Sequence, residues 1–147
     1  MNSIDPPVYI AGLGVISAIG NNVAESLSSF DALHPGMAAI TKLDTIHRGQ
    51  LPVAEVKLTN QELADRAGVS AAWPRTALLS AVAAKEALAD AGVGDLKNIR
   101  TGFISANTTG GMDLTENFMI EFRNDPSKGH LRDVVNHECG AVTDLVA

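Results

Sequence analysis

Residues 8–20 read VYIAGLGVISAIG, a largely apolar stretch that glycines divide at positions 12, 14 and 20. Pro6 and Pro7 precede the stretch. A short apolar run bounded by turn-forming residues is typical of a buried β-strand. We therefore expect a strand over Val8–Gly14 and a tight turn before the next helix.

The chain after this strand alternates between helical and extended patterns. Asn21 or Asn22 is suited to cap a helix that continues to about Leu33, where His34-Pro35-Gly36 ends it. Two further strands are expected at Leu51–Val56 and Arg100–Ala106, and further helices at 59–67, 75–91, 112–123 and within 134–147. This order predicts an α/β fold with parallel strands joined by right-handed crossovers.

The clearest helical pattern lies between Arg75 and Ala91, with Pro74 before it and Gly92 after it. No charge occurs from Thr76 to Ala84, and apolar side chains occupy more than one face of the helix. An exposed helix would carry a polar stripe there. We therefore expect this helix to lie between other layers, with its alanines allowing neighbouring backbones to approach closely.

Composition excludes several classes of protein. The 147 residues are 46% hydrophobic and 19% charged, which favours a single globular domain over a disordered chain. The net charge of −6 and the lack of a basic cluster argue against nucleic-acid binding. No apolar run is long enough for a membrane span, and the start MNSIDPPVYI does not resemble a secretory signal. With one cysteine, the chain is expected to be cytoplasmic.

Three local motifs admit functional readings. Gly12-Leu13-Gly14 follows a predicted strand, but Ser17 stands where a dinucleotide-binding motif has its third glycine, which disfavours a nucleotide site. His137 and Cys139 lack the two further ligands that a zinc site requires, so no metal is expected. Cys139 as a nucleophile is a weaker alternative to an incidental cysteine.

The third motif is Asn107-Thr108-Thr109-Gly110-Gly111, placed between a predicted strand and a predicted helix. Two glycines in this position allow the backbone to approach a ligand or a partner segment. Amides at the start of the following helix are also suited to stabilise an anion. From the residues alone, a ligand-binding loop and a plain connection are equally favoured.

Together these segments resemble the elongation-type β-ketoacyl-[acyl-carrier-protein] synthases of the thiolase-like superfamily. Residues 8–20 are similar to the opening strand and turn of that family, with Ala11 in place of a usual threonine and Ala18 in place of a usual proline. Residues 85–92 (KEALADAG) are similar to the end of its long N-terminal helix, and Arg100-Thr101-Gly102 followed by Gly110-Gly111 to its next strand and glycine loop. The resemblance extends over the whole chain.

The resemblance implies that residues 1–147 are an incomplete, N-terminal part of the synthase domain. They would form the N-terminal half of a layered α/β/α/β/α fold. It implies decarboxylative condensation of an acyl thioester with malonyl-acyl carrier protein, in fatty-acid or related polyene or polyketide synthesis. No cofactor is implied, and the partners are acyl carrier protein and a second subunit of a homodimer. In the family, a segment similar to Val134–Val142 packs across that dimer interface.

The resemblance also assigns roles to particular residues. The glycine loop of the family lines the acyl channel, which makes Thr108, Thr109, Gly110 and Gly111 the expected substrate-pocket residues, with Thr109 at the gate position. Arg66, Arg75, Lys128 and Arg132 correspond to basic residues on which the carrier protein docks. The family's catalytic cysteine lies in a Thr-Ala-Cys turn, which the His-Glu-Cys-Gly around Cys139 does not match. No catalytic residue is therefore assigned, and the chain alone is expected to be inactive.

Two other functions stay open. A stand-alone interaction or binding module is expected to use the face left uncovered by a missing half, and to associate with itself through that face. A nucleotide-dependent oxidoreductase is disfavoured by Ser17.

Overall fold

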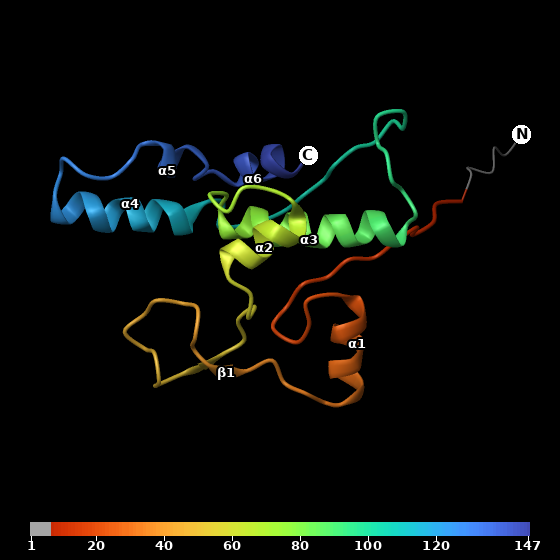
Figure 1. Ribbon diagram of the computed structural model, residues 1–147, viewed down its shortest axis with the longest axis horizontal. Coiled ribbons are helices and arrows are strands. Elements are labelled where there is room, and N and C mark those ends of the chain that lie inside the picture. The colour runs from red at the N-terminus through yellow and green to blue at the C-terminus, as the bar shows by residue number, and fades with distance from the viewer. Residues whose placement is uncertain (1–6) are drawn as a thin grey trace, which may run out of the picture.

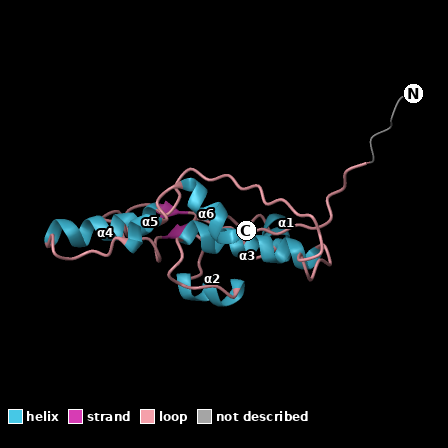
Figure 2. Ribbon diagram, turned by 90° about the horizontal axis from the view of Figure 1, so that it is seen from above, coloured by secondary structure: helices cyan, strands magenta, loops and turns pink. Residues whose placement is uncertain are grey.

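The computed structural model describes residues 7–147, in which helices predominate (Figures 1 and 2). In chain order the elements are α1 (Val23–Asp31), β1 (Ala38–Ala39), β2 (Pro52–Val53), α2 (Asn60–Ala67), α3 (Arg75–Asp90), α4 (Met112–Asn124), α5 (Arg132–Val135) and α6 (Cys139–Val146). The fold class is thus mixed α and β. The predicted helices are all present, with ends within a few residues of those expected.

The core of the molecule forms where α2 packs on α3. Leu63 and Ala64 of α2 are fully buried against Leu78 and Val82 of α3. Helix α2 is held by a complete capping box, in which Thr59 caps the amide of Glu62 and the Glu62 carboxylate accepts from the amide of Thr59. It ends at Gly68, whose φ of +73° is the left-handed conformation that glycine adopts without strain.

Helix α3 also receives the predicted first strand on a stripe of small side chains. A methyl group added to Gly12 would overlap the carbonyl of Ala87, and one added to Gly14 would overlap the carbonyl of Ala83. Only glycine allows the two backbones to approach this closely. The expectation that the alanines of this helix permit close backbone contact is confirmed.

The predicted parallel sheet is not formed within residues 7–147. Val8–Gly14 and Arg100–Ala106 are not strands, because neither segment has a neighbouring strand to bond to. The amides of Leu13 and Val15 instead donate to the carboxylates of Asp90 and Glu86 on α3, each at 2.9 Å. A short apolar run in the sequence indicates an extended backbone, but strand pairing depends on a second segment that the local pattern does not contain.

The small sheet joins β1 and β2 in antiparallel register, with Ala38 opposite Val53 and Ala39 opposite Pro52. The predicted strand Leu51–Val56 is therefore shortened to two residues, and its partner β1 was not expected from the sequence. The Glu55 carboxylate holds the loop that follows β1, since it accepts from the backbone amides of Thr41, Lys42 and Leu43 and from the Thr41 hydroxyl.

The chain exposes more surface than a compact protein of its size. Its accessible surface is 10614 Å², whereas a folded monomer of this mass exposes about 7,200 Å². Large apolar side chains contribute to the excess, with Val8 97% and Ile104 96% exposed on the two extended segments. Among residues 7–147, no helix is both long and apolar enough to cross a membrane.

Candidate functional site

The glycine loop before α4 is held by another segment of the same chain. A Cβ on Gly110 would overlap the carbonyl of His137, and one on Gly111 would overlap the carbonyl of Asn136. The amide of Gly111 donates to the carbonyl of His137 at 3.2 Å. Gly110 is buried and adopts a φ of +53°. The two glycines are therefore required by contact with residues 136–139.

Asn107 fixes the loop from its other end. Its Oδ1 accepts from the amide of Gly110 at 2.8 Å, and its Nδ2 donates to the carbonyl of Cys139 at 3.1 Å. One amide side chain thus closes the turn on itself and ties it to the start of α6. The loop is therefore held by contacts within the chain, which sequence reasoning did not anticipate because it treated Asn107 only as a turn residue.

Thr108 and Thr109 are exposed. The Thr109 hydroxyl lies 3.3 Å from the hydroxyl of Thr76 in the first turn of α3. The four predicted pocket residues therefore divide into two buried glycines that position the turn and two exposed threonines that present hydroxyl groups. On geometry, the threonines are the ones able to meet a ligand.

The segment Val134–Val142 lies beside this loop and is partly buried inside the chain. The His137 ring approaches Thr115 of α4, with Nδ1 and Oγ1 3.0 Å apart. Val142 is fully buried, with α6 packed on α3. Cys139 is exposed at the first position of α6 and forms no disulfide. Within residues 7–147, no three His, Cys, Asp or Glu side chains group into a metal site.

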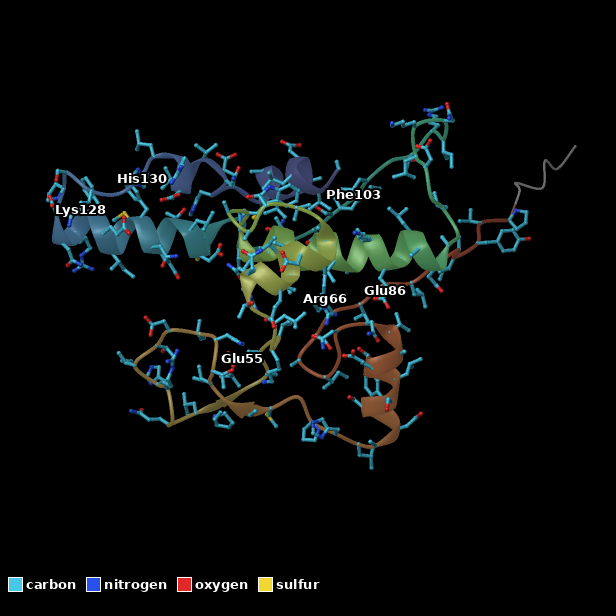
Figure 3. All side chains as sticks on the ribbon, in the orientation of Figure 1. Glu55, Arg66, Glu86, Phe103, Lys128 and His130 are labelled. Atoms are coloured by element: carbon cyan, nitrogen blue, oxygen red, sulfur yellow. The ribbon has the colours of Figure 1, made fainter. Side chains whose placement is uncertain are left out.

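The four predicted carrier-docking cations do not form one patch. Arg66 lies in the last turn of α2 near the middle of the molecule, whereas Lys128 lies in the loop beyond the C-terminal end of α4 (Figure 3). Lys128 and Arg132 are exposed beside Asp125 and Asp133, at 4.0 and 3.8 Å. Both pairs are open to solvent and contribute little to stability.

Arg75 has a different environment from the other three. Its guanidinium donates to the Asn60 side chain and to the carbonyls of Val56 and Leu58, at 2.8 to 3.0 Å. Its backbone amide donates to Asp113 of α4 at 2.9 Å. Arg75 is half-buried, and it joins the start of α3 to the segment before α2 and to α4. This architectural role was not visible from the sequence, where Arg75 stood out only as a cation.

An open groove of about 800 Å³ runs beside Arg75, between α4 and the segments around β2. Leu79, Val53 and Ile120 give it an apolar part, and Lys42, Asp113 and Glu116 give it a charged part. The first turns of α3 and α4 separate the groove from the exposed Thr108 and Thr109. The groove was not predicted, because its walls come from four separate stretches of the sequence.

No protein-family model matches the chain, and no curated protein sequence matches it significantly.

Proposed function

We propose that this chain forms part of a 3-oxoacyl-[acyl-carrier-protein] synthase with a thiolase-like layered fold. Its role is to build one wall of the pocket in which an acyl thioester condenses with malonyl-acyl carrier protein, with loss of carbon dioxide. The reaction belongs to fatty-acid synthesis or to a related polyene or polyketide pathway. The family resemblance of the sequence supplies this activity.

The observation that carries the proposal is the turn at Thr108–Gly111, which contacts within the chain hold in place. Gly110 and Gly111 are fixed against residues 136–139, so the turn does not need to be ordered when a ligand binds. Preorganised walls reduce the entropic cost of holding a flexible chain. Thr108 and Thr109 stay exposed at the surface of this fixed turn, where an acyl chain would pass.

The proposal assigns no attacking group to these residues. A condensing nucleophile needs a thiolate and a base within reach. Cys139 is exposed, and its backbone carbonyl accepts from Asn107. The chain by itself therefore shapes the pocket and does not form the acyl-enzyme.

Photo-cross-linking tests the proposal. The chain is mixed with acyl carrier protein that bears a fatty acyl group with a terminal diazirine, irradiated, and digested for peptide mapping by mass spectrometry. We expect label on the peptide containing Thr108 and Thr109. The label should fall when Thr109→Phe fills the turn, and should be unchanged for Thr101→Phe, a threonine exposed on a different segment. Label distributed over unrelated peptides would contradict the pocket assignment.

Intact-mass measurement after incubation with acyl thioester tests the absence of covalent chemistry. We expect no acyl adduct on the wild-type chain. An adduct that disappears in Cys139→Ser would overturn the assignment of a purely structural role.

The second candidate is an interaction module without catalysis. The observation that favours it is the accessible surface of 10614 Å², well above that of a compact monomer. A module of this kind would show no preference for acylated over unacylated carrier protein. Fluorescence anisotropy with both forms of a labelled carrier protein separates the two candidates, since the synthase proposal requires the acyl group to strengthen binding.

A further inference from the structure

The groove of about 800 Å³ beside Arg75 has walls that hydrogen bonds within the chain hold in place. On one side, the Glu55 carboxylate accepts from three backbone amides and fixes the loop at Thr41–Leu43 (Figure 3). On another side, the Arg75 guanidinium fixes the segment before α2, and the Arg75 amide bonds to Asp113 of α4 at 2.9 Å. These contacts arrange separate segments around one opening, whose volume is in the range of small-molecule sites.

Helix α4 forms an acidic wall of the groove. Its lining residues lie at i, i+3, i+4 and i+7, on one helical face, and are Asp113, Glu116, Asn117 and Ile120. One carboxylate oxygen of Asp113 accepts from the Arg75 amide, and the other has no hydrogen-bond donor among residues 7–147. Glu116 is exposed and forms no ion pair within the same range. This wall therefore offers carboxylate oxygens with free acceptor capacity.

The other charged groups of the groove do not neutralise this wall. Hydrogen bonds from the Thr41 hydroxyl and from backbone amides lower the pKa of Glu55 to about 2, so Glu55 stays anionic. The Arg75 guanidinium donates to three neutral oxygens. The pKa of Glu62, outside the groove, is lowered by its capping-box hydrogen bonds and further by the charge of Lys42. In all, four carboxylates and two cations line the groove, which favours a cationic ligand.

The groove also has an apolar part. Val56 and Leu79 are half-buried in its lining, and Ile120 is 61% exposed. Among the described residues that line the groove, none is aromatic. Aromatic faces are what hold a quaternary ammonium group, whereas carboxylate oxygens suit a primary ammonium group with its three N–H donors. The lining thus favours a primary ammonium group on an apolar stem.

We propose that this groove binds an aliphatic primary amine. The ammonium group donates to the carboxylates of Asp113 and Glu116, and the alkyl stem lies against Leu79, Val56 and Ile120. A carboxylate ligand of the same length is rejected, because like charges would meet on α4. This inference does not rest on the synthase proposal, because it uses only the groove and its charges.

Nuclear magnetic resonance titration of the full chain tests the proposal, with n-hexylammonium as the probe. We expect the backbone amide signals of Asn117 and Ile120 to shift, with a dissociation constant of about 1 mM. n-Hexanoate, with the opposite charge, should not shift them. n-Hexyltrimethylammonium keeps the charge but has no donor, and should bind about threefold more weakly or worse. n-Butylammonium is shorter by two CH₂ groups and should bind up to about tenfold more weakly.

Three variants locate the site. Glu116→Gln should weaken binding of n-hexylammonium about three- to fivefold. Lys42→Met removes a cation from the groove and should strengthen binding about twofold. Glu121→Gln is the matched control, because Glu121 is an exposed glutamate of the same helix that does not line the groove, and its affinity should equal that of wild type. Far-ultraviolet circular dichroism checks that each variant keeps its helices.

Several results would overturn the proposal. Binding of n-hexanoate as tight as that of n-hexylammonium would do so, as would a titration in which neither Asn117 nor Ile120 shifts. A Lys42→Met variant that binds the amine more weakly would contradict the sign of the charge effect. Equal losses in Glu116→Gln and Glu121→Gln would show that the amine responds to the net charge of the chain and not to the groove.

Discussion

The backbone amide of Val15 donates a 2.9 Å hydrogen bond to the carboxylate of Glu86, 71 residues further along the chain. The other carboxylate oxygen accepts from the amide of Val23, the first residue of α1, at 2.8 Å. One side chain of α3 therefore fixes both the extended N-terminal segment and the start of α1. In a regular sheet a neighbouring strand would satisfy the amide of Val15.

Glu86→Ala removes both acceptors and should lower the free energy of unfolding by about 1–3 kcal/mol. Glu86→Gln keeps one acceptor oxygen and should cost roughly half as much. Urea unfolding followed by circular dichroism measures the difference. Glu121→Ala, which alters an exposed glutamate of α4, should stay within about 0.5 kcal/mol of wild type. A Glu86→Ala chain as stable as wild type would show that these bonds do not hold the segment.

Gly14→Ala should be strongly destabilising. The added methyl group would meet the carbonyl oxygen of Ala83 and lie 2.7 Å from the backbone nitrogen of Ala87, so either the segment or α3 must move. Forcing extra volume into such a contact costs about 1–3 kcal/mol, and a backbone neighbour puts Gly14 at the upper end. Thermal unfolding of the variant measures this loss.

Gly140→Ala is the opposite case and serves as the control for Gly14. Gly140 lies within α6, and apart from its chain neighbours and the backbone of its own helix no described atom lies within 4 Å of the position its Cβ would take. Alanine is the better helix former by up to about 1 kcal/mol, so this variant should unfold at a higher temperature than wild type. Equal effects of the two substitutions would refute the packing role assigned to Gly14.

Local sequence signals predicted the helices of this chain well. Asn22 caps α1 by accepting from the amide of Glu25, and Thr59 with Glu62 forms the capping box of α2. Helix α2 ends at Gly68, directly after the range 59–67 that was expected for it. These signals act within three or four residues of the element that they define, so a sequence contains all that is needed to find them.

The strands and the site depend on distant residues and were predicted less well. Strand β1 consists of two alanines, which have little β-propensity. They form a strand only because they pair with Val53 and Pro52 of β2. The sequence marked Gly110 and Gly111 as special, but nothing local identified His137 and Asn136 as the reason. Contacts of this kind follow from packing, which a single sequence does not display.

The stability of the β1–β2 region should fall in acid through Glu55. Hydrogen bonds from the Thr41 hydroxyl, and from the amides of Thr41, Lys42 and Leu43, lower the pKa of Glu55 from 4.5 to about 2. Because the folded-state pKa is the lower one, the stabilisation is complete above about pH 4.5 and is lost as the pH falls toward 2. Chemical denaturation at a series of pH values measures this slope.

Glu55→Gln isolates the contribution of Glu55 from those of other acids. The pKa values of Glu25, Glu62 and Asp125 are also lowered by hydrogen bonds, so the whole chain loses stability in acid. The difference in stability between wild type and Glu55→Gln should shrink between pH 4.5 and 2 and be constant above that range. A difference that does not vary with pH would contradict the role given to this carboxylate.

Arg75→Lys distinguishes an architectural arginine from a docking cation. Lysine keeps the positive charge, but its single ammonium group cannot reproduce the planar fork that reaches Asn60, Val56 and Leu58 together. We expect a loss of about 1–3 kcal/mol in the free energy of unfolding, measured in urea. Arg66→Lys, at an exposed position of α2, should stay within about 0.5 kcal/mol. If Arg75 were only a surface cation for a carrier protein, neither lysine variant would change the free energy of unfolding. Reversal of the charge at Arg75 would then affect carrier binding alone.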